Sequence, residues 1–400
     1  MSPCRSISFA RRATHTVPTF VIANSFGDMC VAFRGALAAE LVSRGHRVIL
    51  STPRPEEVTE QSVVAAAKAL GAEVVFAPFG RTSLDPRGEL AAARHYRALF
   101  GDLRPAGVLA TNPKPIFHAL PAALSCGVPR RVAMVTGLGY AFTSRTLKAR
   151  VLRVVATRLY RRSMRAATTV VFQNRDDRGE FDARGLLPPT LATGLVGGSG
   201  IDLARFPERP PPDGPPTFTL VARLLGDKGV REFAEAARRV RREVPEARFR
   251  LVGWIDSNPA AIRADELAAW VASGDIEHAG RVSDVRDELA AAQVFVLPSY
   301  REGLPKSTLE ALATGRPIVT TDAPGCRETV AGATRGERIS VGENGVLVRP
   351  RDAEALADAC LLLARDAALR GSMGAASRRL AERAFDVRAV NATLIEALGA

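Results

Sequence analysis

The chain has 400 residues, of which 46% are hydrophobic and 24% charged, and its formal net charge is +13. This length favours two domains over one compact core, and the composition excludes a disordered chain. No apolar run approaches the roughly 20 residues of a membrane-spanning helix, and the scattered cysteines and histidines argue against a zinc site or a disulfide framework.

The positive charge lies in the first half of the chain. Residues 1–200 carry 27 Lys and Arg against 13 Asp and Glu, whereas residues 201–400 carry 28 against 29. A basic half indicates a polyanionic partner, which would be nucleic acid, anionic lipid or a phosphorylated substrate. An Arg-rich composition that serves solubility alone is the alternative explanation.

The first half predicts one α/β domain. Residues 1–16 are basic and lack the apolar block of a signal peptide, so we expect a disordered lead-in there. Beyond them, apolar β-branched runs alternate with helical stretches, and the runs lie at 17–25, 46–52, 72–78, 107–112, 130–137 and 168–174. Continuous apolar strands separated by helices are typical of parallel sheets covered on both faces. We therefore predict a Rossmann-like domain over 17–205.

Within this half, segment 144–167 predicts a basic helix with eight Lys and Arg and no acid. One face of this helix carries the apolar residues Leu147, Val151, Val154 and Val155. Such a helix suits an anionic membrane surface or a diphosphate. The candidate membrane contacts are Arg150, Arg153, Arg161 and Arg162. The alternative is a solvated helix that packs on the sheet through its valines.

The second half repeats the α/β pattern after a Pro-rich linker. Residues 206–216 hold six prolines in eleven residues, which excludes a helix or an inner strand and predicts a semi-rigid hinge. Apolar runs then recur at 216–224, 247–254, 276–282, 293–299, 316–322 and 344–350. We predict a second Rossmann-like domain over 217–383, facing the first across a cleft, and a final helix over 384–400. For that helix, a return to the first domain is a candidate arrangement.

The most specific segment for chemistry is 299–322. A helix is predicted to begin near Lys306, directly after Pro305, which suits a first helical position. The free N–H groups at such a helix start can bind a diphosphate. Glu302 lies in the loop before the helix and Glu310 within it, so the two carboxylates can hold two hydroxyl-rich parts of one ligand. Two solvated surface charges are the alternative.

The two glutamates are separated by seven residues, which resembles the signature of the retaining family-4 glycosyltransferases of GT-B architecture. Segments 220–240 and 277–285 are similar to other parts of that family. The resemblance implies that Arg223 and Lys228 neutralise the donor diphosphate, that Glu310 binds the ribose, and that Glu302 addresses the transferred sugar. It further implies that the loop backbone binds sugar and diphosphate through Gly303, Leu304 and Pro305. The residues nearest the base would be Gly280, Arg281 and Val282.

Shorter motifs at 133–142, 170–177, 198–206, 256–262 and 324–330 resemble one subgroup of the family. This subgroup extends polyprenyl-diphosphate-linked sugars and includes the bacillosaminyl-diphospho-undecaprenol N-acetylgalactosaminyltransferases. The resemblance implies a UDP-sugar donor and an undecaprenyl-diphosphate-linked acceptor bound by the first domain. It also implies a peripheral position on the cytoplasmic, inner face of the plasma membrane. In the family, retaining transfer is attributed to front-side attack with cations in place of a metal, so we expect neither metal nor cofactor.

Two positions depart from the family pattern. Many members carry a histidine after the fifth strand of the first domain, whereas this chain has none there. The upstream His118 falls in a predicted helix, where a structural role is the better interpretation. Where the family histidine would lie, after the fifth strand, the candidate acceptor-binding residues are Thr136, Gly137 and Gly139. An Asn-Phe-Arg of the subgroup is replaced by Ala-Phe-Arg, whose Arg34 would meet a phosphate or lie on a helix surface.

The sequence leaves three alternatives to a transferase that acts on a lipid-linked acceptor. The first is a family-4 transferase that acts on a soluble small-molecule acceptor. The second is a GT-B sugar epimerase, which needs acid–base carboxylates and histidines around the nucleotide sugar, and the sequence lacks such a His cluster. The third is a nucleic-acid-binding protein, but only 6% of residues are aromatic and no stacking platform accompanies the arginines. The resemblance implies a hexosyltransferase of polysaccharide or glycoprotein assembly that moves a hexose or N-acetylhexosamine.

Overall fold

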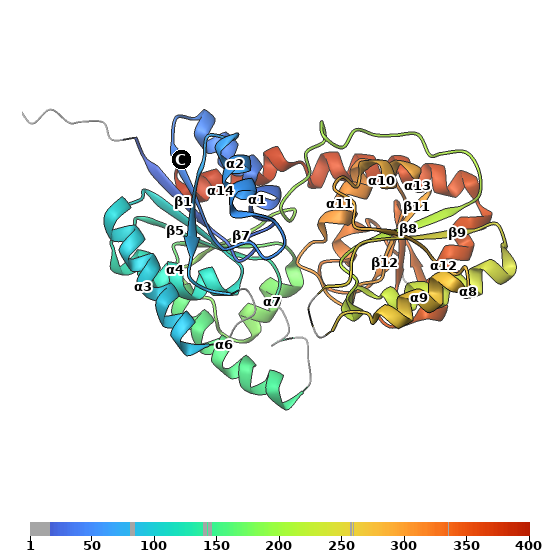
Figure 1. Ribbon diagram of the computed structural model, residues 1–400, viewed down its shortest axis with the longest axis horizontal. Helices are drawn as coiled ribbons and strands as arrows, with labels where there is room; N and C mark the ends of the chain where they lie inside the picture. Colours follow the sequence, from blue (N-terminus) through green and yellow to red (C-terminus); the bar gives the residue numbers. More distant parts are fainter. Residues whose placement is uncertain are drawn as a thin grey trace, which may run out of the picture.

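The computed structural model describes residues 17–80, 85–138, 142, 146–256, 258, 260–334 and 336–400. The expected lead-in over 1–16 and the candidate Gly139 lie outside these described residues. Two domains lie side by side, and each is a twisted sheet with helices on both faces (Figure 1). The prediction of two doubly wound, mostly parallel sheets is confirmed.

The first sheet has seven parallel strands in the order β3-β2-β1-β4-β5-β6-β7. Their bounds are β1 Thr19–Ala23, β2 Arg47–Pro53, β3 Glu73–Ala77, β4 Gly107–Thr111, β5 Arg130–Val135, β6 Thr169–Phe172 and β7 Ala192–Leu195. The strand order reverses between β1 and β4, which is where open α/β sheets bind ligands.

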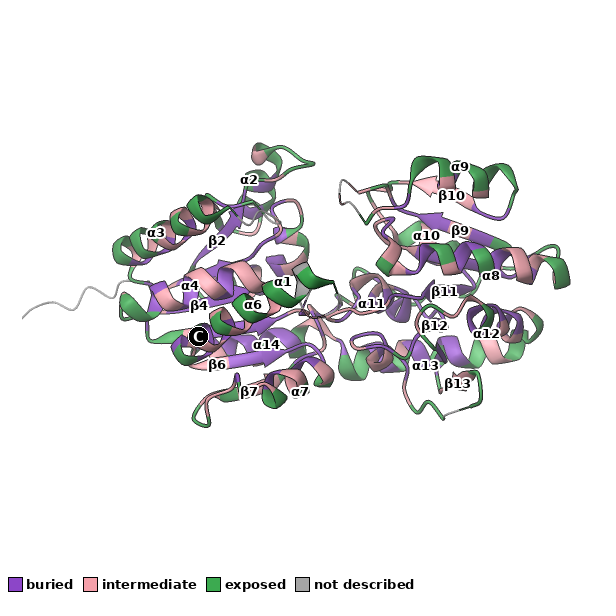
Figure 2. Cartoon of the chain, turned by 90° about the horizontal axis from the view of Figure 1, so that it is seen from below, coloured by how far each residue is buried: buried purple, intermediate pink, exposed green. Residues whose placement is uncertain are grey.

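Helices cover both faces of this sheet and bury two apolar cores. One core contains residues of α1 (Cys30–Ser43) and α2 (Glu60–Lys68). The other contains residues of α3 (Pro86–Leu103), α4 (Pro113–Ser125), α6 (Leu147–Ala166) and α7 (Arg175–Ala183). In Figure 2 the central strands are buried, while the edge strands and the helices are partly exposed, as this layering requires.

The second sheet has the order β10-β9-β8-β11-β12-β14-β13, in which β13 alone runs antiparallel to its neighbour. Its strands are β8 Thr217–Val221, β9 Arg248–Val252, β10 Glu277–Gly280, β11 Val294–Leu297, β12 Ile318–Thr321, β13 Ile339–Val341 and β14 Gly345–Val348. Its helices are α8 Val230–Glu243, α9 Ala264–Ala272, α10 Arg286–Ala291, α11 Lys306–Ala313, α12 Ala353–Arg365 and α13 Ala367–Ala384.

The chain passes between the domains twice, and the two passages pair with each other. The Ile201 amide donates to the Phe385 carbonyl at 2.8 Å, and the Val387 amide donates to the Ile201 carbonyl at 3.0 Å. Beyond this point α14 (Val387–Leu398) packs against α1, β4 and β5 of the first domain. The second domain is therefore enclosed in sequence by segments of the first.

The Pro-rich segment lies against the second domain rather than between the two domains. Arg316 donates to the Pro210 carbonyl at 3.1 Å, and the Gln293 amide donates to the Pro212 carbonyl at 3.1 Å and to the Gly214 carbonyl at 3.0 Å. Arg316 itself is fully buried. The passage between domains precedes the prolines, so the segment expected to act as a hinge is held as an edge of the second domain.

None of the helices in the described part of the chain has the length and apolarity that a membrane span requires.

Candidate active site

The two domains meet where the carboxyl ends of their strands face each other. The loop after β11 reaches the ends of β5 and β6, where the Asn174 amide donates to the Gly303 carbonyl at 2.7 Å. A Cβ on Gly303 would lie 2.1 Å from the Thr136 carbonyl oxygen, so only glycine permits this approach. Two ion pairs, Arg301–Asp177 and Arg327–Asp176, flank the contact.

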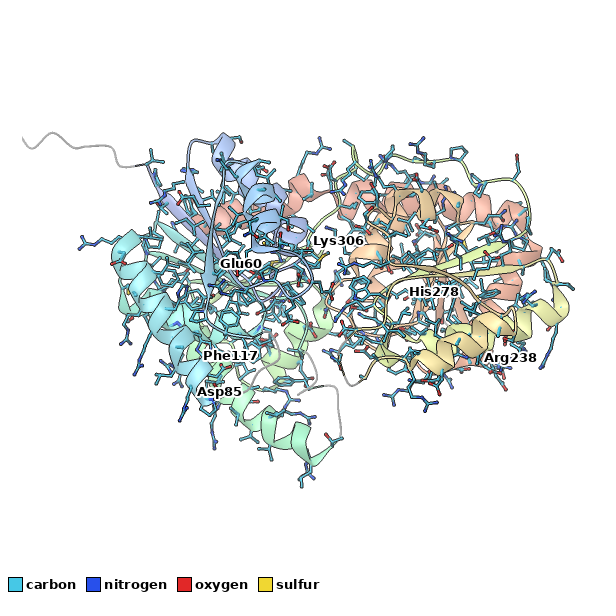
Figure 3. All side chains as sticks on the ribbon, in the orientation of Figure 1. Glu60, Asp85, Phe117, Arg238, His278 and Lys306 are labelled. Atoms are coloured by element: carbon cyan, nitrogen blue, oxygen red, sulfur yellow. The ribbon has the colours of Figure 1, made fainter. Side chains whose placement is uncertain are left out.

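Lys306 extends this contact from the start of α11. Figure 3 places its side chain between the domains, where Nζ donates to the Ala32 carbonyl and lies 5.3 Å from the centre of the Phe33 ring. Pro305 is the N-cap residue of the helix, one position before the first helical position that was expected for it. The contacts therefore join the start of α11 to α1 of the first domain.

Lys228 and Glu302 form an ion pair beside this contact. Lys228 ends a short 3₁₀ turn after β8, and its Nζ donates to Glu302 Oε1. The Ser299 hydroxyl donates to the same oxygen at 2.8 Å. Only 19% of the Lys228 side chain and 14% of the Glu302 side chain are exposed, so little water screens the pair. Residues that follow two neighbouring strands thus bring a cation and a carboxylate together.

Glu310 has a different environment, although it lies on the helix that begins a few residues after Glu302. It is half-buried, and none of the described residues forms a hydrogen bond with its carboxylate. Burial raises its pKa to about 7, while the charges of Lys306 and Arg205 oppose that rise. An unpaired carboxylate of this kind can accept hydrogen bonds from ligand hydroxyls.

Arg223 and Arg281 are each paired already. Arg223 follows β8 and donates to Asp256 Oδ2 at 2.6 Å. Arg281 follows β10, lies over the Trp254 ring at 4.4 Å, and forms an ion pair of 2.8 Å with Glu57 of the first domain. The Trp254 indole donates to Glu57 as well, at 3.2 Å. Gly280 precedes Arg281 at the end of β10, and the partly buried Val282 follows it.

The first domain contributes Arg34, Thr136 and Gly137. Arg34 is only 4% exposed and its Nε has no hydrogen-bond partner. Among the described residues, its guanidinium donates only to the Phe33 carbonyl, at 3.3 Å. Loss of solvent therefore lowers its pKa to about 10. Thr136 accepts a hydrogen bond of 2.6 Å from Asn112, and a Cβ on Gly137 would lie 3.5 Å from the Gly303 amide.

His118 has a structural partner. Its Nε2 lies 2.5 Å from Glu89 Oε2, and Lys114 binds the other oxygen of that carboxylate at 2.7 Å. This contact joins α3 to α4.

The apolar face of helix α6, which could have packed on the sheet, is exposed to solvent. Leu147, Val151, Val154 and Val155 are 75%, 59%, 52% and 47% exposed. The buried residues of the helix are instead Tyr160, Ser163, Met164 and Ala166 near its end. The alternative of a helix packed through its valines is therefore wrong. In Figure 1 the first turns of α6 project beyond the rest of the first domain.

The structure brings some of the predicted site residues together and leaves others apart. Lys228, Glu302 and Gly303 form one group with the ends of β5 and β6, whereas the α6 arginines belong to a separate surface. Sequence reasoning missed Glu57, Trp254 and Asn174, whose partners are far away in the chain. No group of three His, Cys, Asp or Glu side chains in the described residues is arranged to hold a metal ion.

Comparisons with known proteins agree with this architecture. Two family models match: a glycosyl transferase 4-like domain over residues 31–193 and glycosyl transferases group 1 over residues 215–366. The N,N'-diacetylbacillosaminyl-diphospho-undecaprenol alpha-1,3-N-acetylgalactosaminyltransferase of Campylobacter jejuni is 29% identical over 84% of this chain and 87% of its own. A glycogen synthase of Mycobacterium tuberculosis is 31% identical over 51% of this chain and 48% of its own.

Solved structures share the whole fold. Sucrose-phosphate synthase from Thermosynechococcus elongatus has a TM-score of 0.73 at 18% identity, covering 95% of this chain and 98% of that one. Anabaena HepE in complex with UDP-glucose has a TM-score of 0.73 at 16% identity, covering 95% and 99%. The fold and the matched domains define a glycosyltransferase of GT-B architecture. The chain belongs to the family-4 glycosyltransferases, and it resembles the bacillosaminyl-diphospho-undecaprenol N-acetylgalactosaminyltransferase subgroup.

Proposed function

We propose that the protein moves a hexose or N-acetylhexosamine from a UDP-sugar to a sugar linked to polyprenyl diphosphate, with retention at the anomeric carbon. The observation that carries the donor assignment is the Lys228–Glu302 pair beside the unpaired carboxylate of Glu310. Support for the acceptor class comes from the Campylobacter jejuni relative, whose name specifies a diphospho-undecaprenol substrate.

On the donor side, Glu310 accepts hydrogen bonds from the ribose hydroxyls and Glu302 addresses the transferred sugar. Arg223 and Lys228 neutralise the diphosphate, together with the backbone of Gly303, Leu304 and Pro305 at the start of α11. The base lies against the loop of Gly280, Arg281 and Val282. Binding of the diphosphate requires Lys228 and Arg223 to share or exchange their present carboxylate partners, Glu302 and Asp256.

The protein contributes position and charge stabilisation to the reaction. The acceptor hydroxyl attacks the anomeric carbon on the face that the leaving UDP departs from, and a donor phosphate oxygen takes the hydroxyl proton. As the bond to UDP breaks, negative charge grows on the diphosphate, and cations beside it stabilise that charge more strongly than in the ground state. Cationic side chains take this role here without a metal ion.

On the acceptor side, we assign Thr136 and Gly137 to the acceptor and Arg34 to one of its phosphates. The buried guanidinium of Arg34 supports this assignment, because it has no carboxylate partner among the described residues. Gly139 belongs to the same proposed surface but lies outside the described residues.

The lipid part of the acceptor places the enzyme at a membrane surface, and α6 is the proposed contact. Its exposed apolar face would enter the headgroup region, while Arg150, Arg153, Arg161 and Arg162 attract anionic lipid. A lipid-linked acceptor built from cytoplasmic nucleotide sugars places this contact on the inner face of the plasma membrane.

The test is a panel of UDP-sugars offered with a short polyprenyl-diphosphate-linked N-acetylhexosamine, with products identified by mass spectrometry. We expect one donor to be transferred, and Glu302→Ala to abolish transfer while it still binds UDP in calorimetry. Glu310→Ala should instead weaken UDP binding itself. Transfer only to a soluble sugar would contradict the proposal of a lipid-linked acceptor. Equal UDP affinity in the wild type, Glu302→Ala and Glu310→Ala would contradict the roles proposed for the two glutamates.

A further inference from the structure

Neutral polar side chains gather at the point where the order of the first sheet reverses. They follow or end the adjacent strands β2, β1, β4 and β5. We call them the β1–β4 polar cluster, and its members are Asn24, Ser25, Thr52, Thr111, Asn112 and Thr136. None of these side chains is titratable. The position is one at which open α/β sheets bind ligands.

Asn112 holds a backbone conformation that is almost confined to glycine. Its φ is 72° and its ψ is 160°, and a residue with a side chain pays for such a conformation with strain. Its side chain is fixed by the neighbours: Nδ2 donates to Thr136 Oγ1 at 2.6 Å, while Oδ1 accepts from the Ser25 amide at 3.4 Å and from the Thr111 hydroxyl at 3.3 Å. Strain of this kind concentrates at functional sites.

Two donors of the cluster are buried without a partner. Asn24 is 3% exposed and Ser25 is 5% exposed, and neither Asn24 Nδ2 nor Ser25 Oγ has a hydrogen-bond partner. The orientation of the Asn24 amide is set by its other end, because Oδ1 accepts from the Phe26 amide at 2.9 Å and from the Thr52 hydroxyl at 3.1 Å. Buried donors without partners are rare, since each costs free energy.

The cluster adjoins the loop that carries Glu302. Its member Thr136 has a backbone oxygen so near Gly303 that a Cβ there would lie 2.1 Å away. The β1–β4 polar cluster is therefore next to the residue assigned to the transferred sugar, but on the opposite domain.

We propose that the β1–β4 polar cluster binds the acceptor sugar, with Ser25 and Asn112 as specificity-determining residues for its hydroxyl and amide groups. This assignment rests on the proposed glycosyl transfer. A phosphate would leave its charge uncompensated among six neutral side chains, whereas a sugar ring offers neutral donors and acceptors to match them. The ligand supplies the partners that Asn24 Nδ2 and Ser25 Oγ lack.

Two variants of the full chain separate binding from folding. Ser25→Ala removes a hydroxyl that has no partner, so the fold loses no hydrogen bond. Asn112→Gly removes the amide contacts but relieves the backbone strain, and these two effects on stability have opposite signs. We expect both variants to melt within about 3 °C of the wild type and to bind UDP normally. We also expect kcat/KM for the acceptor to fall about tenfold, mainly through KM.

Matched controls exist away from the sheet edge. Ser163 is a buried serine whose hydroxyl also has no partner, near the end of α6. Arg104 has a positive φ of 44° at the end of α3. Ser163→Ala and Arg104→Gly should leave acceptor kinetics unchanged.

The assay uses a polyprenyl-diphosphate-linked N-acetylhexosamine and its free methyl glycoside at saturating UDP-sugar. Turnover by the wild type tests the proposed function. The ratio of kcat/KM for the acceptor between variant and wild type tests the role of the β1–β4 polar cluster. Unchanged acceptor KM and kcat in both Ser25→Ala and Asn112→Gly would overturn the assignment. A loss of several degrees in melting temperature in Ser25→Ala would do so as well, because it would reveal a structural partner for the hydroxyl.

Discussion

Glu302 and Glu310 lie in one short segment, but their carboxylates differ in hydrogen bonding and in charge compensation. Glu302 is held by Lys228 and the Ser299 hydroxyl, so its charge is compensated within the protein. Glu310 is held by no hydrogen bond from the described residues, and burial raises its pKa to about 7. The first is fixed before a ligand arrives, whereas the second gains its hydrogen-bond partners only with the ligand.

The raised pKa of Glu310 predicts a pH-dependent affinity for uridine, which has no titrating phosphate. Below pH 7 the carboxyl group is protonated, and ribose binding to the carboxylate must first remove that proton. Affinity should therefore fall about tenfold from pH 8 to pH 6, measured by calorimetry. Glu310→Gln, which cannot titrate, should bind uridine weakly and equally at both pH values. A wild-type affinity independent of pH would contradict the role of Glu310 at the ribose.

Helix α6 is the element whose environment the sequence left open. Its composition allowed both a membrane contact and a helix packed through its valines, because helical spacing alone does not say which face meets the sheet. The structure buries Tyr160 and Met164 and leaves Val151 and Val154 exposed. An exposed apolar stripe among arginines is the arrangement of an interfacial helix.

This arrangement predicts salt-sensitive binding to anionic vesicles. Each cation near the surface contributes about 1 kcal/mol, and salt screens that contribution. The wild type should sediment with vesicles containing anionic phospholipid at low ionic strength and be released by high salt. Replacing Arg150, Arg153, Arg161 and Arg162 by Gln should abolish sedimentation without changing UDP binding.

The control removes the same charge elsewhere. In this control variant, α6 is intact and four exposed arginines of the second domain are changed to Gln. They are Arg242, Arg349, Arg379 and Arg383. If both quadruple variants sediment equally with anionic vesicles, α6 is not the membrane contact.

Local sequence signals predicted most elements and part of the candidate site. Twelve apolar runs correspond to strands, whereas β7 and β13 were missed. Both are short edge strands without a fully buried residue, but so is β10, which was predicted. Glu302, Glu310 and Lys228 could be proposed from the sequence because they lie within short, patterned segments. The Trp254–Glu57 contact spans 197 residues, and the strain at Asn112 depends on strands β1 and β5, so no local pattern reveals them.

At the scale of the whole molecule, the domains are connected by two paired passages. A Cβ on Gly200 would lie 2.5 Å from the Val387 Cα, and the φ of Gly200 is 71°. The pairing of Ile201 with Phe385 and Val387 depends on this approach. The paired passages, rather than the Pro-rich segment, therefore connect the two sheets along the chain.

Gly200→Ala should destabilise the protein more than Gly45→Ala. Gly45 has a φ of 85° with no atom within 4 Å of an added Cβ, so both variants carry the backbone penalty of about 1–2 kcal/mol, but only Gly200→Ala displaces a neighbouring chain. Thermal unfolding followed by circular dichroism measures the difference. Equal melting temperatures for the two variants would show that the paired passages tolerate separation.

The return of α14 to the first domain also has a consequence for biosynthesis. Val390, Leu394 and Ile395 complete an apolar core of that domain, yet the ribosome makes them only after the entire second domain. At about 5–20 residues per second, the intervening stretch of nearly two hundred residues takes about 10–40 s to translate. Throughout this interval the nascent first domain presents the apolar face of α1, β4 and β5 to solvent and to chaperones. The core of the first domain can therefore be completed only after the whole second domain has been synthesised.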